Sequence, residues 1–388
     1  MFDERLELRS SMLDGIELAR TRVPEPQGKV VLPEGLVVIS ADNHCEITED
    51  IFYENFPAHL KEKAPRVWFD KYWHIGHKGG MQAFKEIDRM DYLLSNIFVE
   101  NGFEASVRNA HMDAEGVKKE IVFPQSLLGM TRMPDLEVRE WMFSVYNDYM
   151  ARLGKENPGR FYGVGICRNW WDPEKAESAI RQIVDLGLKT LMIPIALKDV
   201  DGKGVSLASE SMDRFFSAVE DAGIPLCFHV GEDPSIEGRG GYGSNYMTAT
   251  GPFRKPFGEL IFGGVFDRHP KLEVVFTEGQ FYWVAGALQD AEHCFDALNG
   301  ALDIKLKHRP THYWRNHCYA TFTIDRLGFE TINYVGADRI MWSSDYPHSE
   351  STFGIGWSAI DDVIQRTSEA DARLILGDTA TRLFHLDD

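Results

Sequence analysis

Cysteine is scarce in this sequence, and no two cysteines form a recognisable pair. The 388 residues include five cysteines, which are widely separated and show no C-x-x-C spacing. An odd number of scattered cysteines supports neither a disulfide framework nor a zinc site made of thiolates. This cysteine usage is typical of a reducing compartment, and we expect a cytoplasmic protein.

Positive charge and long apolar runs are also lacking. The chain carries 41 Lys and Arg residues against 60 Asp and Glu residues, which gives a formal net charge of −19. Nucleic acid and anionic membranes both bind to basic surfaces, so we expect neither as a partner. No apolar signal core follows the N-terminus and no apolar run approaches membrane-spanning length, so secretion is not expected.

The sequence does contain a regular alternation of short apolar runs with amphipathic helical stretches, which is typical of βα units and a parallel sheet. Helix signals separate the runs, such as Asp172-Pro173 at a start and Gly187 and Gly223 at ends. The predicted strands are Leu36–Ala41, Glu120–Pro124, Phe161–Ile166, Thr190–Ile195, Pro225–Val230, Leu272–Thr277, Tyr319–Ile324 and Arg339–Ser344. They predict an α/β fold, a single (β/α)8 barrel of the TIM type over residues 36–388.

Two segments fall outside this alternation. Residues 1–35 are charged and contain proline, and they predict an N-terminal arm. Residues 47–118 form a connection between the first two strands that is far longer than a βα unit needs. This insertion is rich in aromatic residues such as Trp68 and Trp73, so it predicts a lid over the barrel or a contact with another subunit. We expect a homo-oligomer, or a hetero-oligomer with a related barrel.

Polar side chains follow the first predicted strand. The C-terminal ends of barrel strands face the active site, so polar residues there need an explanation. Asp42, His44 and Glu46 alternate with other residues after this strand, and they point to one side for as long as the chain stays extended. Three possible metal ligands therefore leave one strand end together.

Other strand ends carry residues of the same kind. His229 ends the fifth strand, Glu278 follows the sixth, and Asp345 and His348 follow the eighth. A buried carboxylate such as that of Glu278 needs a cation or an arginine partner. The predicted metal ligands are Asp42, His44, Glu46, His229, Glu278, Asp345 and His348. Of these, Asp345, Glu278 and His348 are also predicted to act in catalysis. Imidazole and carboxylate ligands suit divalent zinc, manganese and iron.

Three motifs resemble the amidohydrolase-related family, also called amidohydrolase 2, which includes aminocarboxymuconate semialdehyde decarboxylase. They are the Asp42-x-His44 pair, the segment His229-Val230-Gly231-Glu232 and the segment Ser344-Asp345-Tyr346-Pro347-His348. The resemblance runs from about Leu36 to the C-terminus. It implies metal ligands at Asp42, His44 and His229, with Asp345 as a ligand or proton-transfer group.

The sequence departs from the family's decarboxylases at one position. Those enzymes carry a catalytic His at the end of strand six, where this chain has Thr277-Glu278-Gly279. In its extra carboxylates, Glu46 and Glu278, the chain resembles a small branch of the family, the dinuclear nonheme oxygenases. That branch implies O2-dependent hydroxylation of a small organic substrate, with a reductant and two metal ions per chain (Fe, or Fe with Mn).

Other functions remain open. A metal-dependent hydrolase requires only one ion such as zinc, which lowers the pKa of a bound water while Asp345 accepts its proton. Nonoxidative decarboxylation of a carboxylic acid ranks lower because the strand-six His is missing. A non-catalytic barrel subunit that keeps the metal is a further alternative. Metal content separates the oxygenase from the hydrolase, because zinc cannot change oxidation state as O2 activation requires.

Overall fold

The computed structural model describes residues 23–70, 73–78, 80–83, 104–170, 172–199, 201–231, 239–249, 251, 253–348 and 350–386. Some of the predictions above lie outside these ranges. They concern residues 1–22 of the N-terminal arm, residues 71–72, 79 and 84–103 of the insertion, and Glu232.

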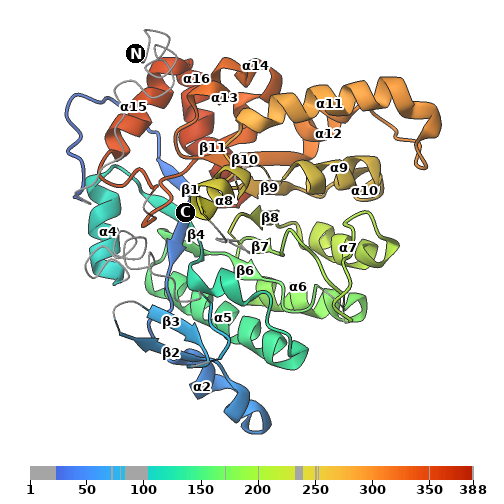
Figure 1. The fold of residues 1–388 in the computed structure, drawn as a ribbon. Coiled ribbons are helices and arrows are strands. Elements are labelled where there is room, and N and C mark those ends of the chain that lie inside the picture. The colour runs from blue at the N-terminus through green and yellow to red at the C-terminus, as the bar shows by residue number, and fades with distance from the viewer. Residues whose placement is uncertain are drawn as a thin grey trace.

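Parallel strands form a closed barrel at the centre of the molecule (Figure 1). They pair in two series, β1-β4-β5 and β6-β7-β8-β9-β10-β11. The strands are β1 (Ile39–Cys45), β4 (Lys119–Pro124), β5 (Phe161–Gly163), β6 (Gly165–Ile166), β7 (Leu191–Met192), β8 (Leu226–His229), β9 (Val274–Thr277), β10 (Cys318–Phe322) and β11 (Ile340–Trp342). The chain beyond β11 closes the barrel on β1, because the Asp345 N–H donates to the Asp42 carbonyl at 2.9 Å. The predicted (β/α)8 barrel is confirmed.

The first strand differs from its prediction. It begins at Ile39 and ends at Cys45, so it contains Asp42 and His44 instead of ending before them. The His44 N–H donates to the Tyr346 carbonyl at 2.7 Å, which keeps this polar segment extended. The hydrogen bonds to the chain after β11 thus extend β1 through residues whose polar character predicted a loop.

The third predicted strand is divided between β5 and β6. Val164 lies between them, and its N–H donates to the Val122 carbonyl at 2.9 Å. Glycines flank this residue because helices approach closely: a Cβ at Gly163 would lie 2.8 Å from the side chain of Met150. The close approach allows α5 (Leu136–Glu156) to cover the strand.

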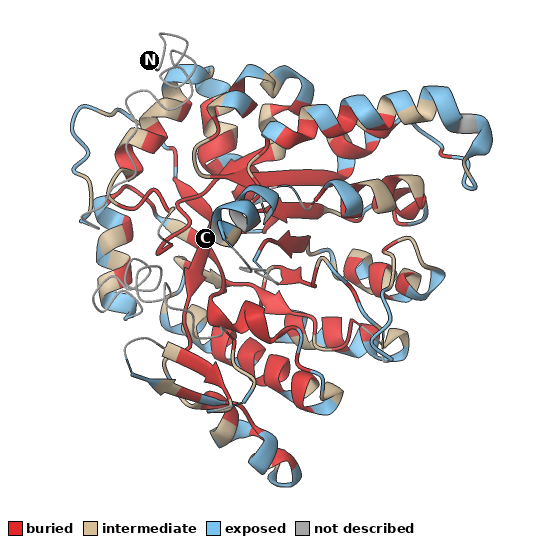
Figure 2. Ribbon diagram, in the orientation of Figure 1, coloured by how far each residue is buried: buried red, intermediate tan, exposed pale blue. Residues whose placement is uncertain are grey.

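Helices surround the barrel, and Figure 2 shows that its strands are buried beneath them. In α7 (Asp213–Ala222), for example, Phe215, Phe216 and Val219 are buried on one face, and Gly223 ends the helix with a φ of 65°. The other helices after β5 are α6 (Ala176–Asp185), α8 (Gly241–Ala249), α9 (Arg254–Phe262), α10 (Val265–Arg268), α11 (Tyr282–Leu298), α12 (Pro310–His317), α13 (Arg326–Glu330), α14 (Ile332–Val335), α15 (Gly356–Arg366), α16 (Glu369–Arg373) and α17 (Thr379–Leu383). Among the described residues, no helix is long and apolar enough to cross a membrane.

The insertion between β1 and β4 contains structure of its own. It forms α2 (Ile51–Asn55), the antiparallel hairpin of β2 (Arg66–Phe69) and β3 (Trp73–Gly76), and α4 (Ala105–Ala114). Figure 1 shows α2 and the hairpin at the foot of the molecule, near α5, and α4 at the side of the barrel. Trp68 stacks on His74, with ring centroids 4.9 Å apart. A role as lid or subunit contact stays a prediction.

Candidate metal centre

The first strand supplies Asp42 and His44. Both side chains are fully buried, and they lie two residues apart on one side of β1. The pairing of β1 with β4 shifts register between Ser40 and Asn43, which marks a bulge at the residues that carry the site. The bulge lets β1 bond to the chain that follows β11, so residues from strands one and eight meet.

Strand β8 ends with His229, and Glu278 directly follows β9. His229 pairs in register with Thr277, so these two side chains share the inner face of the barrel. The next residue in an extended chain would point outward. Glu278 instead has a φ of 65°, a left-handed conformation that turns its side chain toward the site. Its N–H donates to the Thr321 hydroxyl at 2.9 Å, which holds this turn in place.

The segment that follows β11 supplies Asp345 and His348. Asp345 also has a left-handed backbone, with a φ of 59°. His348 Nδ1 forms a hydrogen bond with Asp345 Oδ2 at 3.2 Å and lies at an ion-pair distance of 3.0 Å from Oδ1. Its Nε2 lies 3.1 Å from the side-chain oxygen of Gln125. The His348 ring stacks on that of His44 with centroids 4.0 Å apart. Both nitrogens of His348 therefore have oxygen partners.

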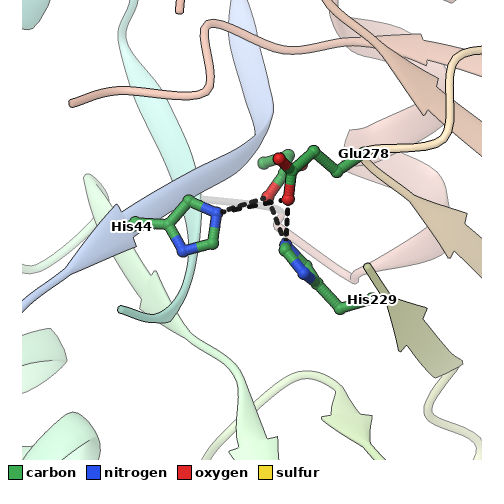
Figure 3. Close-up of side chains that lie close together, drawn as sticks. His44, His229 and Glu278 are labelled. Carbon is green, nitrogen blue, oxygen red and sulfur yellow. Dashed lines mark hydrogen bonds and ion pairs between the residues drawn. The ribbon is translucent and has the colours of Figure 1, made fainter. Parts of the chain in front are cut away.

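These side chains converge on one point, and Figure 3 shows His44 and His229 turned toward the carboxylate of Glu278. The Nε2 atom of His229 lies 3.3 Å from Asp42 Oδ1 and 3.4 Å from Glu278 Oε2. The Nε2 atom of His44 lies 3.4 Å from Asp345 Oδ1. Ligand atoms that share one transition metal at about 2.0–2.2 Å lie about 3–4 Å apart. The separations fit a metal ion.

The protonation of the two histidines also fits a metal ion. The Nδ1 atom of His44 lies 3.0 Å from the Pro124 carbonyl, and that of His229 lies 2.7 Å from the Val230 carbonyl. A carbonyl only accepts, so each Nδ1 carries the proton. Burial lowers the pKa of both imidazoles, which keeps them neutral. Each Nε2 then presents a lone pair to carboxylate oxygens, an arrangement that repels unless a cation or a proton lies between them.

Buried polar atoms at the same place lack hydrogen-bond partners. Within the described part of the chain, these atoms include Asp42 Oδ2, His44 Nε2 and Asp345 Oδ1. Leaving a buried polar group unsatisfied costs about 1–3 kcal/mol, and more for a charged one. The described residues contain two overlapping groups of possible ligands: Asp42, His44, His229 and Glu278, and His44, Glu278, Asp345 and His348. The geometry supports a divalent metal ion at this centre.

Glu46 is brought to a different place from the other predicted ligands. Its carboxylate accepts hydrogen bonds from the Ile47 N–H, at 3.0 Å, and from the Ser126 hydroxyl. The alternation that placed it beside His44 holds only along an extended chain, and β1 ends at Cys45. Glu46 thus belongs to neither group of possible ligands in the described residues.

Gln125 was not among the residues predicted from the sequence. It directly follows β4, and its side-chain oxygen lies 3.1 Å from Nε2 of His348. The rule that identified the other residues, a polar side chain at the end of a barrel strand, also applies to Gln125. An uncharged amide gave too weak a signal beside the carboxylates.

The metal-free protein is expected to lose stability as the pH rises because of Glu278. Burial, and then the charge of Asp345, raise the pKa of Glu278 from 4.5 to about 7. The folded chain therefore binds this proton more tightly than the unfolded chain, and the contribution to stability is lost as the pH rises through about 7. We expect the unfolding temperature of chelator-treated protein to fall more steeply between about pH 5 and about pH 7 than that of Glu278→Gln. Equal slopes in the two proteins would contradict this.

A parallel barrel with an imidazole and carboxylate centre at the C-terminal ends of its strands defines a metal-dependent barrel enzyme. Residues 82–386 match the model of the amidohydrolase family, Amidohydro_2. The chain belongs to this family.

Known proteins resemble this chain over most of its length. A 2-amino-3-carboxymuconate-6-semialdehyde decarboxylase from Dictyostelium discoideum is 26% identical over 355 residues, which cover 87% of this chain and 90% of that protein. An amidohydrolase from Mycobacterium avium subsp. paratuberculosis has a similar structure, with a TM-score of 0.69, 20% identity and coverage of 91% of this chain and 100% of the other. The manganese-bound 5-carboxyvanillate decarboxylase of Novosphingobium aromaticivorans has a TM-score of 0.65, 20% identity and coverage of 90% and 97%.

The dinuclear oxygenase inferred from the sequence is wrong. Two of these three proteins are decarboxylases, and none is an oxygenase. The inference depended on two extra carboxylates, which would balance the charge of two iron ions. Glu46 accepts a hydrogen bond from Ser126 instead, so of these two carboxylates only Glu278 lies at the centre.

Proposed function

We propose that this chain is a metal-dependent, nonoxidative decarboxylase of a small unsaturated carboxylic acid. The observation that carries the proposal is the pair formed by Asp345 and His348, whose Oδ1 and Nδ1 atoms lie 3.0 Å apart. Decarboxylation requires a proton donor beside the group that holds the carboxylate, and this pair adjoins the possible metal ligands. The decarboxylases among the similar proteins favour the same reaction.

The metal ligands in this proposal are Asp42, His44, His229 and Glu278, with Asp345 facing the same ion. We propose one divalent ion per chain, manganese or zinc, because the two groups of possible ligands share His44 and Glu278. When bound, the ion would hold the substrate carboxylate and offset its negative charge.

Asp345 acts as the proton donor in this proposal. In the metal-free chain burial raises its pKa, His348 opposes that effect, and the result is about 7, so the carboxyl group carries a proton in part of the metal-free molecules near neutral pH. Burial alone would lower the pKa of His348, but Asp345 and Glu278 outweigh it and raise that pKa well above its ordinary value. His348 is then an imidazolium that can return a proton to Asp345, and Gln125 accepts from its other nitrogen.

The family resemblance implies that Glu278 takes the place of a catalytic histidine of the family's decarboxylases. Its carboxylate lies 3.4 Å from His229 Nε2 and 3.7 Å from His348 Nδ1, so it reaches both the metal ligands and the proton-donating pair. In the proposed reaction Glu278 binds the ion. We expect a carboxylate at this position to favour substrates with fewer negative charges.

The substrate class follows from the bond that breaks. A proton adds to the carbon that bears the carboxylate, the bond between these two carbons breaks, its electron pair stays with the substrate framework, and CO2 leaves. An unsaturated or aromatic carbon accepts the proton because neighbouring double bonds spread the positive charge. We therefore propose aromatic acids, or unsaturated acids with a neighbouring hydroxyl group.

The proposal predicts release of CO2 without consumption of O2. Protein loaded with Mn²⁺ is incubated without air with hydroxybenzoic and unsaturated acids labelled with ¹³C in the carboxylate. We expect labelled CO2 and, in D2O, a product with one deuterium at the carbon that lost the carboxylate. Absence of labelled CO2 from all of these acids would refute the decarboxylase.

A further inference from the structure

Helix α4 reaches the proposed metal centre through a buried arginine. The side chain of Arg108 is 2% exposed and forks onto Glu120 of β4, with Nε 2.6 Å from Oε1 and Nη2 2.6 Å from Oε2. Its remaining nitrogen, Nη1, donates to the carbonyl oxygen of His44 at 2.7 Å. One guanidinium group thus binds both a buried carboxylate and the backbone of a proposed metal ligand.

The same helix also contacts the segment after strand eight. The Arg108 guanidinium lies over the ring of Tyr346, 5.0 Å from its centroid. His111, one turn further along α4, has its Nδ1 atom 3.0 Å from the Tyr346 hydroxyl. Tyr346 directly follows Asp345, and its carbonyl accepts from the His44 N–H. Strands one and eight therefore meet α4 at adjoining residues.

Glu120 completes this network on the other side of β1. The Asn43 amide donates to Glu120 Oε2 at 2.7 Å. The Asn43 side-chain oxygen in turn accepts from the Tyr346 N–H at 2.9 Å. Asn43 lies between Asp42 and His44, so the network passes between two proposed ligands without including their side chains. A buried ion pair holds its geometry best when its other donors and acceptors also have partners, and here each nitrogen of Arg108 and each oxygen of Glu120 has at least one.

We propose that Arg108 is a positioning residue for the metal centre, which sets the distance between His44 on strand one and Asp345 on strand eight. The inference rests on the metal ligation proposed above, but not on decarboxylation. Groups that position ligands matter because a site must hold its geometry within about 0.5 Å. Lysine could keep an ion pair with Glu120, but its single nitrogen cannot reproduce the three directions of the guanidinium fork.

The test compares Arg108→Lys with the unchanged protein in Mn²⁺ binding. Loss of a group that orients a metal ligand typically weakens metal binding about 10-fold to 100-fold. We expect a decrease in that range by competition with a chelator, together with an altered electron paramagnetic resonance spectrum of the bound Mn²⁺. The double variant Arg108→Gln, Glu120→Gln removes the buried charges as a pair, so it provides the same measurement if Arg108→Lys does not fold.

The matched control is Arg326→Lys. Arg326 is also largely buried and forms an ion pair with Asp362 at 3.3 Å, away from the proposed ligands. This change should leave Mn²⁺ affinity and the spectrum unaltered, whatever it does to stability. Arg108→Lys protein that binds Mn²⁺ within about twofold of the unchanged protein, with the same spectrum, would overturn the inference. If Arg108→Lys weakens Mn²⁺ binding but the unchanged protein releases no CO2 from any acid, Arg108 remains a positioning residue and the decarboxylase is refuted instead.

Discussion

Replacement of His229 with alanine is expected to remove the metal while leaving the barrel folded. His229 Nε2 lies 3.3 Å from Asp42 Oδ1 and 3.4 Å from Glu278 Oε2, so its loss takes a neutral ligand from between two carboxylates. The remaining charges then repel without a central ion. We expect Mn²⁺ affinity to fall more than about 100-fold, beyond the effect of a residue that only orients a ligand. The circular dichroism spectrum should barely change, because the strand end contributes little to the packing of the barrel.

The matched control is His59→Ala. His59 is an exposed histidine that contacts Glu137 at 3.1 Å and belongs to neither group of possible ligands in the described residues. The His59→Ala variant should bind one Mn²⁺ per chain, as we expect of the unchanged protein. Full metal content in His229→Ala would remove His229 from the ligands and would undermine the proposed centre as a whole.

Asp345→Asn is expected to abolish most of the decarboxylation while the protein still binds metal. Asparagine keeps the size of the side chain but cannot donate an acidic proton. Proton transfer by a positioned side chain typically contributes about 10²–10⁴-fold, and we expect kcat to fall in that range. The KM should change little, because the ligands of strands one and five remain. Metal analysis of the same sample separates a loss of proton transfer from a loss of the ion.

Asp325→Asn provides the control for this change. Asp325 is another buried carboxylate, and it accepts hydrogen bonds from the N–H groups of Phe281, Tyr282 and Gly328. Its replacement should lower the unfolding temperature without changing kcat. If Asp345→Asn keeps more than about a tenth of the activity, Asp345 is not the proton donor, and Glu278 or His348 would take that role.

The sequence alone was sufficient to predict the barrel, because its signal is periodic and repeated. Each of the eight predicted runs contains or overlaps a strand. The boundaries were less predictable where tertiary contacts decide them. Asp42 and His44 lie inside β1 because the chain after β11 bonds to it, and this pairing joins residues about 300 positions apart. Only the folded chain brings those residues together.

The site was predictable in its members but not in its arrangement. Position at a strand end brought Asp42, His44, His229 and Asp345 into one group, and the structure places them together. The same argument misplaced Glu46, because it assumed that the strand continued past Cys45. It also gave no reason for Glu278 to face inward, since that direction depends on a left-handed φ. Local backbone conformation of this kind is set by the surrounding structure.

The reaction was the least predictable feature. The number of carboxylates along the sequence suggested an oxidised iron pair, but charge counted along a chain is not charge at one point in space. Glu46 and Ser126 form a hydrogen bond of their own, which removes that carboxylate from the count. Arg108 was missed for the opposite reason: it reaches the site in the folded chain, but no pattern in the sequence indicates its hydrogen bond to the His44 carbonyl.

The left-handed backbone at Glu278 and Asp345 means that a substitution which raises thermal stability there would lower activity. Non-glycine residues in this conformation cost about 1–3 kcal/mol, whereas the added freedom that glycine gives the unfolded chain costs only about 0.4–1 kcal/mol. Glycine at either position would also remove a buried acid. Laboratory evolution for heat resistance alone would therefore be drawn to these two positions and would erase the chemistry there first. A heat-tolerant form of this enzyme has to be sought in mutations elsewhere, with turnover measured in every round.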